Sequence, residues 1–187
     1  PYGVVEKVGS GVTGVKVGDR RLVYPWIGCG NCPVCLSGHD NYCLNNQFLG
    51  VMKPGAYATH VLVPDARYLI DTGDIDEGWA ATLACSGLTA FSAITKLPEL
   101  IAGDWVIVLG CGGLGMAAIA MLRARGVSNI VACDVDAAKL ERARAQGASA
   151  SVDTRNADAL AQLQTITGGA IAGALDFVGM PATVNLG

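Results

Sequence analysis

The second half of the chain alternates between short apolar runs and amphipathic segments. The apolar runs are typical of strands that are buried on both faces. The segments between them repeat apolar residues at three- and four-residue spacing, which is typical of helices with one buried face. The pattern predicts strands near 106–109, 130–133, 150–152 and 174–178, and helices near 114–125, 137–146 and 157–167. Because strand and helix alternate, we expect right-handed parallel crossovers and an α/β fold with half of a doubly wound sheet.

The first half of the chain has a different pattern. Residues 1–68 are rich in valine and glycine with frequent turn signals, which favours β-structure. Within them, residues 56–63 alternate well enough to predict a strand that ends before a proline, and His60 on this strand is interpreted as structural. Residues 74–97 instead favour two helices, near 77–83 and 87–96.

A glycine-rich turn joins the strand at 106–109 to the helix that follows it. Gly110, Gly112 and Gly115 have the spacing G-x-G-x-x-G. In a dinucleotide-binding turn the first glycine permits the tight turn, the second lets the backbone approach a pyrophosphate, and the third lets helix and strand pack closely. The free N–H groups at the start of the helix would then bind the pyrophosphate. An ordinary turn between strand and helix is the alternative.

The next predicted strand supports the dinucleotide interpretation. The apolar run 130–133 ends in Asp134, close to the spacing of about twenty residues at which an acidic side chain can bind an adenosine ribose. A carboxylate at this position favours NAD over NADP, because it repels a 2′-phosphate. Helix capping is the alternative role for Asp134, although Asp136 is better placed to cap the helix that begins near Ala137.

Composition narrows the possible locations and partners. The 187 residues carry a formal net charge of −3, so a surface for nucleic acid or for an anionic membrane is not expected. No stretch resembles a signal peptide or approaches the length of a membrane span. Seven cysteines without a secretory signal favour a reducing compartment, where clustered thiols are more often metal ligands than disulfides. We therefore expect a cytoplasmic protein.

Four of the cysteines gather in a turn-rich segment, residues 28–44, which we call the cysteine lobe. Cys29, Cys32, Cys35 and Cys43 follow the pattern C-x2-C-x2-C-x7-C. Four thiolates can surround Zn²⁺ at about 2.3 Å and leave no position for water, so such a site is structural. An iron–sulfur cluster and redox-active thiols are the alternatives, but the usual cluster pattern has its fourth cysteine after three residues. His39 could replace a thiol as ligand; with four cysteines present, we interpret it as a surface loop residue.

The cysteine lobe followed by the glycine turn resembles the zinc-dependent alcohol dehydrogenases of the medium-chain dehydrogenase/reductase family. The matching residues are 18–20, the four lobe cysteines, 84–90, 110–115, Asp134 and Lys139. The resemblance covers essentially the whole chain. It implies a partial GroES-like catalytic domain over residues 1–86 and a partial NAD-binding Rossmann domain over residues 87–187.

The resemblance also implies roles for individual residues. Cys85 matches a protein ligand of a catalytic zinc, distinct from the zinc of the lobe, although by residue chemistry alone it could equally be a small buried hydrophobe. Thr89 matches a contact to the nicotinamide half of the cofactor, and Lys139 matches a contact to the ribose beside Asp134. The other implied cofactor contacts are Gly110, Cys111, Gly112, Gly113, Leu114 and Gly115 in the glycine turn, with Val178 and Gly179 on the adenine side.

Part of the family's catalytic pattern has no match in these 187 residues. The missing parts are two ligands of the catalytic zinc, a cysteine and the histidine of a Gly-His-Glu motif, and the residues that relay the alcohol proton. We therefore expect an internal piece of a longer enzyme, inactive on its own.

For the longer enzyme, the resemblance implies a zinc-dependent oxidoreductase that transfers a hydride between an alcohol, or the corresponding aldehyde or ketone, and NAD. It also implies a homo-oligomer, either a dimer or a tetramer. A polyol dehydrogenase or another zinc-containing reductase of the same family is an alternative, as is a non-catalytic zinc and nucleotide-binding module. The pattern does not decide which alcohol or carbonyl compound is the substrate.

Overall fold

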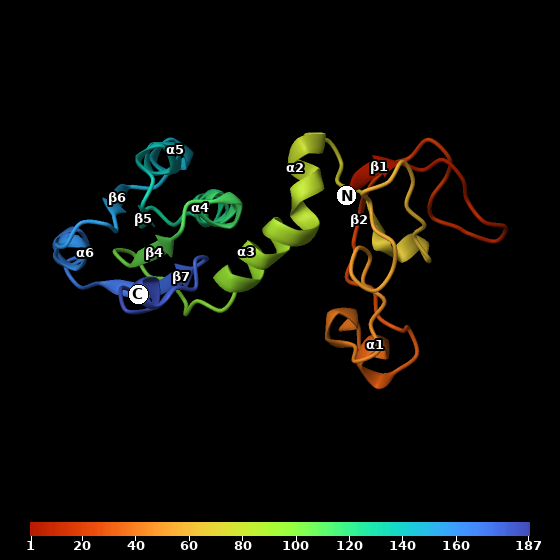
Figure 1. Ribbon diagram of the computed structural model, residues 1–187, viewed down its shortest axis with the longest axis horizontal. Coiled ribbons are helices and arrows are strands. Elements are labelled where there is room, and N and C mark those ends of the chain that lie inside the picture. Colours follow the sequence, from red (N-terminus) through yellow and green to blue (C-terminus); the bar gives the residue numbers. More distant parts are fainter. The chain divides into compact units, whose positions relative to one another are not determined.

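The computed structural model describes residues 1–187 and divides into two compact units, Pro1–Ala84 and Cys85–Gly187. Figure 1 shows the elements of each unit in the order of the chain. The division lies two residues before the boundary that we draw from the sequence after Ser86. None of the helices is long and apolar enough to cross a membrane.

The second unit is built around a sheet of four parallel strands in the order β6-β5-β4-β7 (Figure 1). The strands are β4 (Trp105–Leu109), β5 (Ile130–Asp134), β6 (Ala150–Asp153) and β7 (Ile171–Asp176). The helices are α3 (Leu88–Ile94) before the sheet, then α4 (Gly113–Ala124), α5 (Ala137–Gln146), α6 (Ala159–Thr167) and α7 (Pro181–Val184). The predicted alternation of strand and helix, and with it the α/β fold, is confirmed.

Apolar side chains cover both faces of this sheet. Neighbouring residues of a strand face opposite sides. On one side, Val106, Val108 and Ile130 pack with residues of α3, α4 and α5. On the other, Ile107 and Leu109 pack with residues of α6. Figure 1 shows α4 and α5 together on one side of the sheet and α6 apart from them. Burial from both sides explains why the strands appear in the sequence as unbroken apolar runs.

The strand order places a topological switch point at β4. From β4 the chain adds β5 and then β6 in one direction, and it then crosses to β7 on the other side of β4. In open parallel sheets, ligands bind outside the carboxyl ends of the strands at such a point. The glycine turn, residues 110–115, follows the carboxyl end of β4, so it lies at this position.

The first unit is a small β-structure with little regular helix. Its three strands form an antiparallel sheet in the order β1-β2-β3: β1 (Tyr2–Val4), β2 (Arg20–Val23) and β3 (Leu69–Ile70). Its helices are the short α1 (Pro33–Leu36) and α2 (Glu77–Thr82), and Asp76 caps α2 by accepting a hydrogen bond from the N–H of Trp79. The largest buried side chains around the sheet are Leu22, Val23, Ile27 and Tyr68.

The strand predicted at 56–63 is wrong. These residues form no strand, and the side chains of Tyr57 and Leu62 are exposed. Alternation fixes a strand only where one face is buried against a partner, and this segment has neither a ladder nor a buried face. His60 therefore lies in an irregular exposed segment, where its Nε2 pairs with the carboxylate of Glu6.

The first glycine of the turn yields a test of the fold. Gly110 has φ +88°, and a Cβ there would lie 2.6 Å from Cγ2 of Val178. We expect Gly110→Ala to lower the free energy of unfolding by about 2–4 kcal/mol, through the left-handed backbone and the clash. Gly112 has φ −78° and open space around its Cα, so Gly112→Ala is the matched control, with an expected loss below about 1 kcal/mol. Urea denaturation of both variants measures the difference, and equal losses would contradict the packing described here.

Candidate functional site

The cysteine lobe is shaped by turns that bring its thiols inward. Gly30 and Gly38 turn the chain with φ near +80°, at +78° and +82°. Between them, Pro33 begins α1 at a position where a missing N–H costs nothing, and Cys32 and Cys35 lie on one side of this short helix. A 3-10 turn, Asp40–Tyr42, then leads to Cys43.

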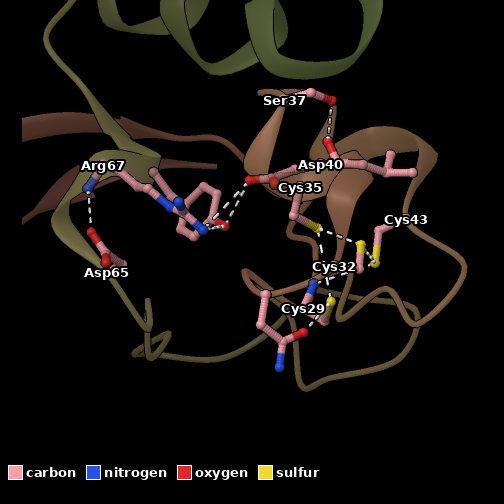
Figure 2. Close-up of polar contacts among 11 residues, drawn as sticks. Cys29, Cys32, Cys35, Ser37, Asp40, Cys43, Asp65 and Arg67 are labelled. Atoms are coloured by element: carbon pink, nitrogen blue, oxygen red, sulfur yellow. Dashed lines mark hydrogen bonds and ion pairs between the residues drawn. The ribbon is translucent and has the colours of Figure 1, made fainter.

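The four sulfur atoms lie together, all within 4.8 Å of one another (Figure 2). The Sγ–Sγ distances are 3.5 Å for Cys32 and Cys35, 3.8 Å for Cys32 and Cys43, and 3.9 Å for Cys29 and Cys35. A tetrahedron with Zn–S bonds of about 2.3 Å has edges of about 3.8 Å, so the donor set fits Zn²⁺ with all four positions filled by sulfur. His39 is exposed and is not part of this group.

The lobe already favours a thiolate at one ligand. The backbone N–H groups of Asn31 and Cys32 lower the pKa of the Cys29 thiol to about 6. Desolvation by burial raises the pKa of the Cys35 thiol to about 12. Zinc binds thiolates, so metal binding has to release the protons of the remaining thiols, above all that of Cys35.

Asp40 connects the lobe to the rest of its unit (Figure 2). Its Oδ2 accepts a hydrogen bond of 2.9 Å from the hydroxyl of the buried Tyr68 and lies 3.6 Å from Nη2 of Arg67. The guanidinium of Arg67 also stacks over the Tyr68 ring at 4.7 Å. Burial, and then the hydrogen bond to Asp40, raise the pKa of Tyr68, so the phenol stays a donor. A second 3-10 turn, Ala66–Tyr68, which leads into β3, thereby holds the metal-binding loop through Arg67 and Tyr68.

A second group of predicted residues meets at the carboxyl edge of the parallel sheet. We call this group the glycine edge; it comprises residues 110–115, Asp134, Lys139 and residues 177–179. A Cβ on Gly115 would lie 1.9 Å from the carbonyl oxygen of Gly110, which shows how closely α4 packs on the end of β4. Around Gly112 and Gly113, by contrast, a Cβ would meet no atom within 4 Å, and no side chain caps α4. The turn is thus an open cradle with free N–H groups, which fits an anionic pyrophosphate.

Asp134 is buried behind this turn, with only 8% of its surface exposed. Its Oδ2 accepts a hydrogen bond of 2.7 Å from the N–H of Cys111, and its Oδ1 accepts one of 3.0 Å from the N–H of Asp136. Nζ of Lys139 lies 3.8 Å from the same Oδ1. Asp136 caps α5 through the N–H groups of residues 138 and 139, as the sequence predicts. Each carboxylate oxygen can accept more than one hydrogen bond, so Asp134 keeps acceptor capacity beyond these contacts.

Asp176, at the end of β7, also contributes to the glycine edge. The sequence analysis did not identify this residue. Its Oδ1 accepts hydrogen bonds from the N–H groups of Val178 at 2.8 Å and Gly179 at 3.0 Å, and its Oδ2 accepts one from the Thr183 hydroxyl. Partial burial opposes ionisation, but these donors lower the pKa of Asp176 below its usual value. The carboxylate shapes the loop at Val178, which lies against Gly110. The strand predicted at 174–178 runs past Asp176, whereas β7 ends at this residue, so the prediction did not place the acid at a strand end.

Cys85 and Thr89 lie apart from both groups in the chain, on the helical segment before the sheet. Cys85 is exposed within a π-helical turn, Leu83–Gly87, and Thr89 is exposed in the first turn of α3. Single π-helical turns occur often at functional sites. The only group of three or more potential metal ligands in residues 1–187 is the cysteine lobe, so no complete set of ligands forms at Cys85.

A β-unit with a four-cysteine lobe and a parallel sheet with a glycine edge are together typical of zinc- and dinucleotide-binding dehydrogenases. Two family profiles match the chain. One described as "Alcohol dehydrogenase GroES-like domain" matches residues 1–74, and one described as "Zinc-binding dehydrogenase" matches residues 113–187. Both descriptions agree with the resemblance stated above.

Individual relatives lead to the same family. An NAD-dependent alcohol dehydrogenase of Sulfolobus acidocaldarius is 36% identical over 184 residues, which cover 98% of this chain and 53% of the relative. An L-threonine 3-dehydrogenase of Bacillus subtilis is 32% identical over 167 residues, 89% of this chain and 47% of the relative. The crystal structure of the alcohol dehydrogenase from Aeropyrum pernix matches with a TM-score of 0.87 and 34% identity, over 98% of this chain and 55% of that chain.

The chain belongs to the zinc-dependent alcohol dehydrogenases of the medium-chain dehydrogenase/reductase family. It spans about half the length of the curated relatives that it matches, at 53% and 47% of the two named above. The resemblance noted in the sequence is therefore confirmed at the level of the family.

The entrance of the cysteine lobe yields a test of the metal site. A Cβ on Gly28 would lie 2.4 Å from Sγ of Cys35 and 3.1 Å from Oδ1 of Asp40, so Gly28→Ala has to displace a ligand. We expect this variant to retain less than about half of the zinc of the unmodified protein after dialysis against a chelator. Gly3→Ala, at a glycine with no atom within 4 Å of its Cβ position, is the control and should retain all of it. Elemental analysis measures the ratio of zinc to protein, and full retention by Gly28→Ala would refute the site.

Proposed function

We propose that the protein is an NAD-dependent zinc alcohol dehydrogenase that transfers a hydride between an alcohol, or the corresponding aldehyde or ketone, and NAD. The observation that carries the proposal is the buried carboxylate of Asp134 beside the open glycine turn. Relatives named NAD-dependent alcohol dehydrogenase, aligned over nearly the whole chain, support it. The activity is a proposal because the chain spans only about half of those relatives.

Different residues of the glycine edge bind different parts of NAD. The N–H groups of residues 112–115 bind the pyrophosphate, and Gly112 lets it approach the backbone. Asp134 accepts hydrogen bonds from the adenosine ribose, with Lys139 beside it. Val178 and Gly179 flank the adenine, while Cys111 contributes its N–H to the orientation of Asp134. Thr89 contacts the nicotinamide half by family resemblance.

Two zinc ions have different roles in this proposal. Cys29, Cys32, Cys35 and Cys43 hold a structural zinc, which substitutes for an apolar core in the lobe. Cys85 is one ligand of a catalytic zinc, which would supply Lewis-acid polarisation of the alcohol oxygen. Three protein ligands and an open position are required for that chemistry, and residues 1–187 form no group of three ligands that includes Cys85.

The relatives also favour a second candidate substrate class. An L-threonine 3-dehydrogenase is 32% identical to the chain, so the substrate hydroxyl could belong to an amino acid or a polyol instead of a simple alcohol. A non-catalytic zinc and nucleotide-binding module is the third candidate. Turnover of ethanol, L-threonine and a polyol by the full-length protein distinguishes the three.

Location and assembly remain predictions. All seven cysteines are free, which supports a reducing compartment such as the cytoplasm. A homo-oligomer, dimer or tetramer, is expected from the family resemblance, and sedimentation of the full-length protein tests it.

Cofactor preference should depend on Asp134. Its carboxylate binds both ribose hydroxyls but repels a 2′-phosphate, so we expect Asp134→Ser to weaken NAD binding and to reduce the preference for NAD over NADP about tenfold or more. Because Asp134 also binds the N–H of Cys111, some loss of stability is expected as well, and thermal unfolding should be measured beside the affinities. Equal affinities of the unmodified protein for NAD and NADP would count against this assignment.

Catalysis should depend on Cys85. We expect Cys85→Ala in the full-length protein to lower the rate of alcohol oxidation about a hundredfold or more, since a zinc ligand is lost. Affinity for NAD and the zinc content of the cysteine lobe serve as controls and should not change. An active Cys85→Ala enzyme would rule out Cys85 as a catalytic ligand.

A further inference from the structure

A second carboxylate lies beside Asp134 on the neighbouring strand. Asp153 is the last residue of β6, and it is the register partner of Asp134 on β5. Partners on neighbouring parallel strands are about 4.8 Å apart and point their side chains to the same face. The N–H of Thr154 also donates to the carbonyl of Asp134 at 3.1 Å, which fixes the turn after β6 against the end of β5.

The carboxylate of Asp153 forms a bidentate ion pair with the guanidinium of Arg155. Nε of Arg155 lies 3.0 Å from Oδ1 and 3.2 Å from Oδ2, and Nη2 lies 2.6 Å from Oδ2. The backbone N–H of Arg155 donates to Oδ1 at 3.0 Å, so the turn itself supports the pair. Arg155 is more than half exposed, while Asp153 is largely covered. A bidentate pair on a constrained turn is stronger than an ordinary surface ion pair.

Arg155 also interacts electrostatically with Asp136, in the turn after β5. The hydrogen bonds and charge of Asp153, and then the charge of Asp136, raise the pKa of Arg155. Asp136 follows Asp134 by two residues and caps α5. Around the end of β5, the carboxylates Asp134, Asp136 and Asp153 therefore meet two cations, Lys139 and Arg155. An arginine at this position, if free, is the residue best suited to bind a phosphate.

We propose that Asp153 is a second determinant of cofactor selectivity, which keeps Arg155 from binding a 2′-phosphate beside Asp134. The proposal rests on the proposed function, because it assumes that the adenosine ribose binds at Asp134. Asp134 disfavours the phosphate directly by repulsion. Asp153 acts through Arg155. A 2′-phosphate can bind the guanidinium of Arg155 only if it displaces the carboxylate of Asp153, which already forms a bidentate ion pair with it. The preference for NAD over NADP then depends on two carboxylates, Asp134 at the end of β5 and Asp153 at the end of β6.

The test uses two probes of the adenosine end, 5′-AMP and adenosine 2′,5′-bisphosphate, with affinities measured by calorimetry on the full-length protein. Asp153→Asn keeps the shape of the side chain and removes its charge. We expect the affinity of this variant for the bisphosphate to rise about tenfold, as for one new charge-assisted phosphate contact, and its affinity for 5′-AMP to stay within about twofold.

Two further variants separate the ion pair from general effects. Asp158→Asn removes one negative charge from the same connection, at an exposed residue that contacts Gln162 and not Arg155, and should leave both affinities unchanged. Adding Arg155→Ala to Asp153→Asn should abolish the gain, which a mere loosening of the turn would not do.

The outcomes of this test separate the two proposals. If the bisphosphate affinity is unchanged in Asp153→Asn while 5′-AMP still binds, Asp153 has no role in selectivity and the inference is overturned. A gain that persists without Arg155, or that appears equally in Asp158→Asn, overturns it as well. If the unmodified protein binds neither 5′-AMP nor NAD, the proposed function itself fails.

Discussion

The hydrogen bond between the N–H of Cys111 and the carboxylate of Asp134 joins the glycine turn to the neighbouring strand. The bond is 2.7 Å long and buried, and it connects the turn after β4 to the end of β5. A charged acceptor in such a place makes a strong bond and is costly to leave unpaired. The same carboxylate also receives the N–H of Asp136, which fixes the start of α5. The side chain of Asp134 thus fixes both the glycine turn and the start of α5, and these two bonds in turn fix the orientation of its carboxylate.

The two units reach a stable fold by different physical means. The parallel sheet buries apolar side chains on both faces, and residues 106–109 of β4 and 130–133 of β5 are almost completely inaccessible. The cysteine lobe has no such core; its inward-facing atoms are sulfurs, with Asp40 and Tyr68 connecting it to β3. Stability of the lobe depends on what neutralises those thiolates, whereas stability of the sheet depends on packing. Zinc loss and core mutations should therefore act on separate parts of the chain.

The sequence predicted those features whose signal is local and redundant. The strand at 106–109 is apolar at every position because both faces are buried, and the glycine spacing follows from the close contact of Gly115 with Gly110. Residues 56–63 misled the prediction because alternation does not reveal whether a partner strand exists. Neither Asp176 nor the pair of Asp153 and Arg155 could be identified from spacing, because their roles arise from register across strands and from turn geometry.

Three strands of the sheet end in aspartate, and each carboxylate is satisfied in a different way. Asp134 receives two backbone N–H groups, and Asp176 receives two N–H groups and a hydroxyl. The hydrogen-bond donors to both carboxylates are neutral, and Asp134 has in addition the ammonium of Lys139 at 3.8 Å from its Oδ1. Asp153 instead receives a guanidinium, which cancels its charge. On the outer strand β6, the guanidinium of Arg155 is therefore free to bind another anion only when its ion pair with Asp153 is broken.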